Sequence, residues 1–121
     1  MGKFVPKNKH KFDGRSCIYR SLWERKVMLY CDRSPSVVRW SSESIAIKYW
    51  DSDTDRYRTY YPDFVIEYID KQCRVRKKIV EVKPYYQCKW RKNKDKWSYA
   101  ADWCDKNGYD FQVITEKEIK P

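Results

Sequence analysis

Three charged residues at the ends of predicted strands have the types and the spacing to hydrolyse a phosphodiester bond. Asp63 stands where a strand is predicted to begin, and Glu81 and Lys83 follow in the segment Val80-Glu81-Val82-Lys83. Because side chains alternate along a strand, Glu81 and Lys83 share one face and the two valines share the other. A hairpin of this length can bring Asp63 beside Glu81.

Two carboxylates at one point make a hard-oxygen site suited to Mg²⁺ or Mn²⁺, and such a metal activates water and neutralises phosphate charge. Lys83 could hold or deprotonate the attacking water, or stabilise the charge of the transition state. An acidic residue followed by Glu-x-Lys on the neighbouring strand is the pattern of the PD-(D/E)XK nucleases. The alternative is a surface Glu-Lys pair, but Glu81 lies in an apolar run where an unpartnered charge is costly.

Glu24 is the candidate third metal ligand. Ser21 and Glu24 have the spacing of a capping box, which predicts that a helix begins here. On a helical wheel, Glu24 falls between Met28 and Cys31 on the apolar side, and Asp32 falls on the opposite side. Glu24 therefore either points inward as a ligand or only caps the helix, and the two roles are compatible.

The surrounding patterns predict one mixed α/β domain over residues 1–121 with a central sheet. Residues 1–16 are rich in lysine and are expected to form a basic N-terminal arm or an irregular lead-in to the first helix. Alternating apolar residues indicate strands, and apolar residues at helical spacing indicate helices. The predicted elements are a helix from Ser21 to Cys31 or Asp32, strands at 37–40, 45–49, 56–61, 63–69, 75–83 and 111–114, and a helix at 89–106.

The charge of the chain is segregated along its length. The 121 residues carry a formal net charge of +10, with an excess of cations in residues 1–30 and 71–121 and an excess of acids in residues 31–70. Two basic segments around an acidic centre suit a polyanion held on both sides of a carboxylate site. The single histidine, His10, excludes a multi-histidine metal site. No apolar run has the length of about 18 residues that a membrane span needs.

Basic residues beside the site are the candidate DNA-binding residues. One group leads into the helix that carries Glu24, and the other follows the strand that carries Glu81, where Lys96 is a further cation. The candidates are Lys7, Lys9, Lys11, Arg15, Arg20, Lys89, Arg91, Lys92 and Lys94. Tyr19, Tyr85 and Tyr86 could stack on splayed bases or belong to the core or its rim. Trp90, Trp97 and Trp103 are expected to pack in the core.

These motifs together resemble the head-completion nucleases of T-even-like tailed phages and, more distantly, the TnsA-like transposon endonucleases. The resemblance rests on Tyr-Arg-Ser-Leu-Trp-Glu-Arg-Lys, Val-Val-Arg-Trp-Ser-Ser-Glu-Ser-Ile, Tyr-Tyr-Pro-Asp-Phe and Val-Glu-Val-Lys-Pro, and covers nearly the whole chain. It implies a restriction-endonuclease-like core, with a central mixed sheet flanked by helices. It also implies metal-dependent DNA cleavage by Glu24, Asp63, Glu81 and Lys83. Gln87 matches a glutamine of some relatives, although position 91 is Arg where the Gln-x-x-x-Tyr pattern has tyrosine.

The same resemblance implies a role in processing phage DNA ends during head completion. The expected partners are double-stranded DNA and phage head or portal proteins, with no membrane, and the expected location is the cytoplasm of the infected cell or the virion. One site cuts one strand at a time, so double-strand breaks favour a homodimer. Two alternatives stay open: a non-catalytic protein that binds DNA ends during head completion, and a junction-resolving or transposition endonuclease.

Overall fold

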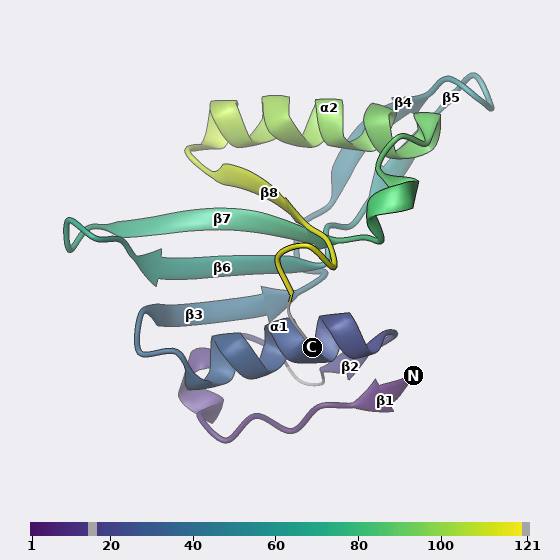
Figure 1. Ribbon diagram of the computed structural model, residues 1–121. Coiled ribbons are helices and arrows are strands. Elements are labelled where there is room, and N and C mark those ends of the chain that lie inside the picture. The colour runs from purple at the N-terminus through teal and green to yellow at the C-terminus, as the bar shows by residue number, and fades with distance from the viewer. Residues whose placement is uncertain (15–16, 120–121) are drawn as a thin grey trace.

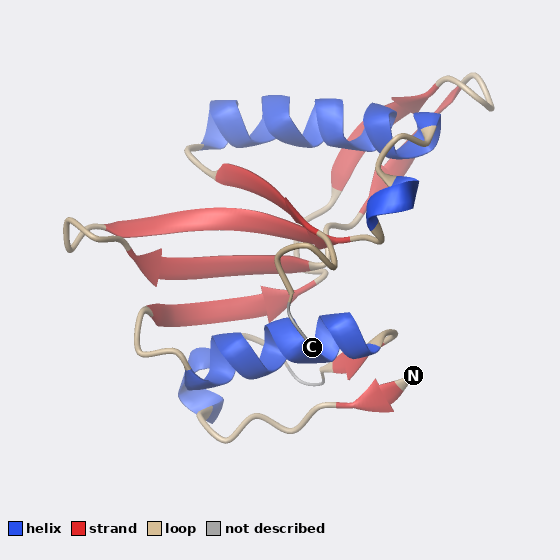
Figure 2. Cartoon of the chain, viewed as in Figure 1, coloured by secondary structure: helices blue, strands red, loops and turns tan. Residues whose placement is uncertain are grey.

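The computed structural model describes residues 1–14 and 17–119, which form a central mixed sheet with helices on both sides. A four-stranded sheet has the order β3-β6-β7-β8, and two two-stranded sheets, β1-β2 and β4-β5, lie beside it (Figure 2). The elements are β1 (Gly2–Lys3), η1 (Lys9–Lys11), β2 (Ile18–Tyr19), α1 (Leu22–Arg33), β3 (Val37–Ser42), β4 (Ile47–Asp51), β5 (Arg56–Tyr60), β6 (Phe64–Ile69), β7 (Val75–Val82), η2 (Tyr85–Gln87), α2 (Arg91–Asn107) and β8 (Asp110–Ile114).

The central sheet combines both kinds of strand pairing. β3, β6 and β7 are antiparallel neighbours, whereas β8 runs parallel to β7 and follows the crossover helix α2. The helices α1 and α2 lie on opposite sides of this sheet (Figure 1). Both predicted hairpins, β4-β5 and β6-β7, are confirmed. The expected mixed α/β architecture is confirmed, with the difference that β4 and β5 form their own ribbon beside the central sheet.

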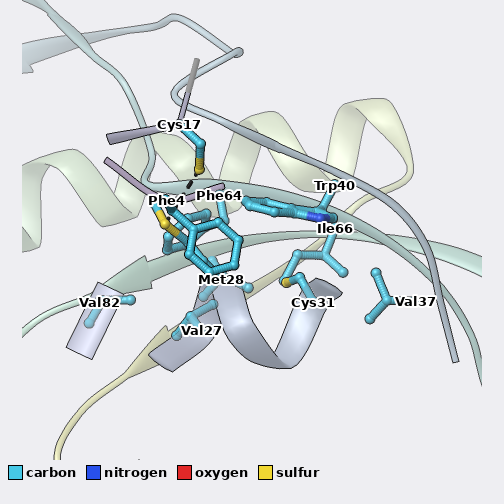
Figure 3. Close-up of a cluster of buried hydrophobic side chains, with 11 residues drawn as sticks. Phe4, Cys17, Val27, Met28, Cys31, Val37, Trp40, Phe64, Ile66 and Val82 are labelled. Carbon is cyan, nitrogen blue, oxygen red and sulfur yellow. Dashed lines mark hydrogen bonds between the residues drawn. The ribbon is translucent and has the colours of Figure 1, made fainter. Parts of the chain in front are cut away.

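Two hydrophobic clusters follow from the alternation of side chains along β7. Val80 and Val82 face α1, where they pack with Met28, Trp40 and their neighbours (Figure 3). Ile79 faces the other way and packs with Ala100 and Cys104 of α2 and with the β4-β5 ribbon. The C-terminal half of β7 is therefore buried on both faces, which explains why this segment reads as a nearly continuous apolar run. Glu81 shares the α2 side of the strand.

The N-terminal segment over residues 1–14 packs against the domain and is not a free arm, and most of its backbone is irregular, in keeping with the alternative of an irregular lead-in. Phe4 and Cys17 are buried in the cluster beneath α1, and β1 pairs with β2. The carboxylate of Asp32 is buried and accepts hydrogen bonds from the backbone N–H groups of Lys7 (3.1 Å) and Asn8 (2.9 Å). Asp32 therefore faces inward, against the helical-wheel expectation, because it binds this segment to α1.

The structure also differs from the prediction at the ends of elements and at one aromatic residue. Trp90 was expected in the core, but its side chain is exposed at the start of α2 and contacts Tyr86 at a ring-centroid distance of 5.9 Å. Trp97 and Trp103 do pack against the α2-side cluster, as predicted. Across residues 1–14 and 17–119, no helix combines the length and the apolar character needed to cross a membrane.

Candidate active site

Asp63 and Glu81 are neighbours at the end of the central sheet. β6 and β7 are in register with Phe64 opposite Val80, so the residue before β6 lies across from Glu81. The backbone N–H of Val82 donates a 2.8 Å hydrogen bond to Asp63 Oδ2, which fixes the carboxyl group against β7. Glu81 is only 3% exposed. The predicted meeting of the two carboxyl groups is thus what the strand register produces.

The two carboxyl groups perturb each other strongly. Burial, the negative charge of Glu81 and a hydrogen bond with Glu81 raise the pKa of Asp63 to about 8. Two desolvated carboxylates in contact cannot both ionise freely, so the pair retains a proton unless a cation compensates the charge. The indole N–H of Trp97, from α2, points at Glu81 Oε2 across 3.4 Å. Glu81 is therefore positioned from the sheet and from α2 together.

Glu24 lies near this pair and also caps α1. Ser21 Oγ accepts the backbone N–H of Glu24 at 3.1 Å, which confirms the predicted N-cap. The Glu24 carboxylate in turn accepts the hydroxyl of Ser21 at 3.2 Å and the backbone N–H of Arg20 at 3.4 Å. Burial and the negative charge of Asp63 raise the pKa of Glu24. The structure thus gives Glu24 the capping contacts and also places it within the field of Asp63.

Lys83 stands where β7 ends, next to both acidic positions. Its backbone N–H donates to the carbonyl of Ile114 at 3.0 Å, and its positive charge lowers the pKa of Asp63. Lys83, Glu24 and Gln87 line one pocket of about 460 Å³ between the start of α1 and the end of β7. Gln87, predicted near the scissile phosphate, therefore borders the same space as two of the predicted catalytic residues.

The donor chemistry of the site suits a hard divalent cation. Asp63 and Glu81 supply adjacent carboxylate oxygens, and Glu24, whose pKa is raised by burial and by the charge of Asp63, adds a third carboxylate nearby. As the side chains stand, no three His, Cys, Asp or Glu residues within the described ranges form a group that could hold a metal ion. The Asp63–Glu81 pair is therefore the assembled part of the site, and Glu24 interacts with it through charge.

Tyr60 of β5 was missing from the predicted residues of this site, and Lys96 of α2 was predicted only as one of the cations that flank it. Tyr60, the last residue of β5, is buried beside Glu81, and burial and the charge of Glu81 raise the pKa of its phenol. Lys96 Nζ lies 5.6 Å from the centre of the Tyr60 ring. Burial and the positive charge of Lys83 lower the pKa of Lys96, against the opposing pull of Glu81 and Asp63. The sequence signal for Lys96 was its place on the predicted helix, one residue before Trp97.

The predicted DNA-binding residues fall into different environments. The ammonium of Lys11 is buried and donates to the carbonyls of Asp32 (3.1 Å) and Ser34 (2.8 Å), so it is a structural residue rather than a phosphate ligand. Arg15 lies outside the described residues. Arg20 forms an ion pair with Glu43. Glu43, and more weakly Glu24 and Asp63, raise the pKa of Arg20, so its guanidinium lies near the site. The remaining exposed cations are Lys7, Lys9, Lys89, Arg91, Lys92 and Lys94.

The second basic group surrounds exposed aromatic rings at the start of α2. Lys92 Nζ lies 5.4 Å from the centre of the Trp90 ring, and Arg91 approaches Asp53 of the β4-β5 turn at 3.9 Å. Tyr85 and Tyr86 are exposed, whereas Tyr19 packs against the core. Cations and aromatic faces at one surface are the composition that binds single or splayed nucleic-acid strands.

Comparison with known proteins agrees with this geometry. Residues 34–116 match the family described as "TnsA-like endonuclease N terminal", a range that includes Asp63, Glu81, Lys83 and α2 and begins after α1. The chain is also 27% identical over 143 aligned positions to the "Head completion nuclease" of Enterobacteria phage T4. That alignment covers 98% of this chain and 93% of the phage T4 protein. The resemblance expected from the sequence motifs is confirmed, and the restriction-endonuclease-like fold with it.

Proposed function

The chain belongs to the TnsA-like endonuclease N-terminal family, and from this premise we propose that it is a metal-dependent DNA endonuclease of the PD-(D/E)XK type. The observation that carries the proposal is the Asp63–Glu81 pair, in which the half-buried carboxyl group of Asp63 meets the buried one of Glu81 beside Lys83 at the end of the sheet. Such a pair costs stability unless it binds a cation. Lys83 also lines a pocket with Glu24 and Gln87, which is the proposed space for a DNA strand.

Each residue of the proposed site has a distinct part. Asp63, Glu81 and Glu24 would hold Mg²⁺ or Mn²⁺, and the bound metal supplies an acidified water molecule and charge neutralisation at the phosphate. The Val82 N–H and the Trp97 indole keep the carboxyl groups of Asp63 and Glu81 in place, respectively. Lys83 holds the attacking water or stabilises the negative charge that develops on the phosphate.

DNA binding is assigned to the exposed cations near the site and on the N-terminal segment. Arg20 lies immediately before α1, and Lys89, Arg91, Lys92 and Lys94 lie at or before the start of α2. Lys7 and Lys9 flank Asn8, which binds Asp32 in the last turn of α1, so they would contact DNA farther from the cleaved bond. Lysine and arginine contacts to phosphates supply sequence-independent affinity and release counterions. Gln87 borders the catalytic pocket and is proposed to contact the scissile phosphate.

The biological role is extended from the relatives. Similarity to the phage T4 "Head completion nuclease" over almost the whole chain supports a function in processing phage DNA ends during head completion. In this role the protein acts on double-stranded DNA, with phage head or portal proteins as partners, in the infected cell or in the virion. A homodimer would provide the two sites that a double-strand break needs. The family match favours a second candidate, a transposition-type endonuclease.

Plasmid cleavage tests the proposed activity. We expect the purified protein to convert supercoiled plasmid to nicked and linear forms in Mg²⁺ or Mn²⁺, and to leave it intact in EDTA. Linear substrates with free and with blocked ends then separate internal cleavage from trimming at ends. Undiminished cleavage in EDTA would remove the metal from the proposal, and an inert protein that still binds DNA ends would favour a non-catalytic role.

A further inference from the structure

A polar hollow lies between β5 and α2, away from the pocket that Glu24, Gln87 and Lys83 share. It has a volume of about 460 Å³ and is lined by Tyr49, residues 56–59 and Lys96. The ribbon supplies one wall because Tyr49, Arg56 and Arg58 occupy the same face of β4 and β5. We call this space the ribbon hollow.

The lining of the ribbon hollow is strongly cationic. Arg56 is exposed, and Arg58 and Lys96 are half-buried, so three positive charges border one space while none of its lining residues is acidic. Arg58 is held in place by Asp51, whose Oδ2 lies 3.4 Å from Arg58 Nε and whose carboxylate is 9% exposed. Anchoring through Nε leaves the terminal guanidinium nitrogens of Arg58 to other acceptors.

Lys96 connects this hollow to the catalytic centre. Its ammonium lies over the ring of Tyr60, whose side chain is buried beside Glu81. The charges of Lys83, Glu81 and Asp63 all act on Lys96, which places it between the carboxyl pair and the hollow. Along the chain, Thr59 precedes Asp63 by four residues, so the two Cα atoms are at most about 14 Å apart. One strand of nucleic acid can span both places.

We propose that the ribbon hollow is a second phosphate subsite, which binds a DNA backbone phosphate at least one nucleotide away from the phosphate at Asp63, Glu81 and Lys83. The inference rests on the proposed endonuclease function and adds a position for the substrate strand. Phosphate suits the hollow because its cations include guanidinium groups, whose forked donors match phosphate oxygens. The subsite sets how the strand enters the catalytic centre, and Lys96 contacts the strand between the two phosphates.

A phosphate in the ribbon hollow also offsets part of the cost of burying a cation. Lys96 is half-buried, and burial, more than the like charge of Lys83, lowers its pKa, against the opposing pull of Glu81 and Asp63. A phosphate bound in the hollow adds a further negative charge beside this ammonium group.

Salt-dependent DNA binding tests the subsite. Affinity for a short duplex is measured without divalent metal at several salt concentrations, in the wild type, Lys96→Met, Arg56→Gln and the double variant. The control is Lys71→Met, an exposed lysine in the turn between β6 and β7. Loss of one phosphate contact lowers the slope of log K against log salt by about 0.9. We expect the double variant to lose about that amount, each single variant to lose part of it, and Lys71→Met to match the wild type.

Cleavage by the same preparations separates this inference from the proposed function. If the wild type cleaves DNA in Mg²⁺ and the hollow variants keep the wild-type salt slope, the subsite is refuted and the endonuclease stands. If the slope falls in the variants but the wild type never cleaves, the subsite stands and the endonuclease does not. An equal decrease in the salt slope of Lys71→Met would also refute the subsite, because the loss of any surface cation would then lower the slope by the same amount. Thermal melting confirms that each variant is folded.

Discussion

Asp63 and Glu81 place two carboxyl groups side by side where water is largely excluded, an arrangement that a protein without a metal or a proton tolerates poorly. The retained proton has a consequence for stability. An unfolded aspartate titrates near 3.9, whereas the pKa of Asp63 in the folded chain is about 8. Between these values the folded protein binds a proton that the unfolded chain has released, so the free energy of unfolding falls as the pH rises.

Asp63→Asn should remove this dependence. In EDTA we expect the variant to melt above the wild type at pH 8 by about 4 °C or more, the shift that about 1 kcal/mol produces in a domain of this size. The gap should narrow as the pH falls and close below about pH 3, where the wild-type carboxyl is protonated in both states. The asparagine oxygen can still accept the Val82 N–H, so this hydrogen bond is retained. Parallel melting curves across this pH range would contradict the coupled pair.

Glu24 has two roles that one substitution separates. Gln keeps an oxygen for the capping contacts with Ser21 and Arg20 but lacks the negative charge that a divalent metal requires. We expect Glu24→Gln to retain or slightly raise the melting temperature in metal-free buffer, because one of the crowded carboxylates is gone, and to lose cleavage. A stable and fully active variant would restrict Glu24 to capping. Glu24→Ala is less informative, since loss of a cap costs about 1 kcal/mol by itself.

At the level of elements, the N-terminal segment contains charged residues with structural roles that the charge pattern of the sequence does not reveal. Lys11 and Asp32 are 21 residues apart, and neither sequence position indicates that they meet. Lys11 satisfies two carbonyls where α1 ends, and Asp32 satisfies two N–H groups of the segment. Lys11 was predicted to bind DNA because it lies in a basic run, whereas its ammonium donates to buried backbone carbonyls instead.

Replacement of Lys11 tests this reinterpretation. In Lys11→Met the carbonyls of Asp32 and Ser34 lose their donor, so we expect the free energy of unfolding to fall by about 1–3 kcal/mol. Lys9→Met, which removes an exposed charge from the same segment, should stay within about 0.5 kcal/mol of the wild type. Denaturant melts of both variants provide the comparison. Equal effects would show that Lys11 is an ordinary surface cation.

Local patterns predicted most of the central elements. Alternation identified β6 and β7, and the capping residues identified the start of α1. The strand register then followed from the hairpin, and with it the meeting of Asp63 and Glu81. The contact of Trp97 with Glu81 could not be predicted in this way, because the turn of α2 that faces Glu81 is set by the packing of α2 on the sheet and on the β4-β5 ribbon. Lys96 was predicted only as one of the cations near the site.

At the scale of the whole molecule, the fold determines where the charged segments of the sequence lie on the surface. The acidic middle of the chain contributes Asp63 at the end of the sheet. Arg20, before α1, and the cations at the start of α2 lie toward this end of the molecule, whereas Lys7 and Lys9 lie beside the opposite end of α1 (Figure 1). Several carboxylates of that middle region serve structure instead, as Asp51 does in holding Arg58. The net charge predicts a polyanionic partner, but only the three-dimensional arrangement separates structural charges from those available to DNA.

The central claim is that Glu81, paired with Asp63, belongs to the catalytic centre of a nuclease. The most direct measurement is single-turnover cleavage of plasmid in Mg²⁺ by Glu81→Gln beside Glu67→Gln, which removes a half-buried carboxylate from the adjacent strand β6. DNA affinity is measured in parallel. The account predicts that Glu81→Gln binds DNA normally and cleaves about 100- to 1,000-fold more slowly, while Glu67→Gln cleaves like the wild type. Wild-type cleavage by a folded Glu81→Gln protein would contradict it.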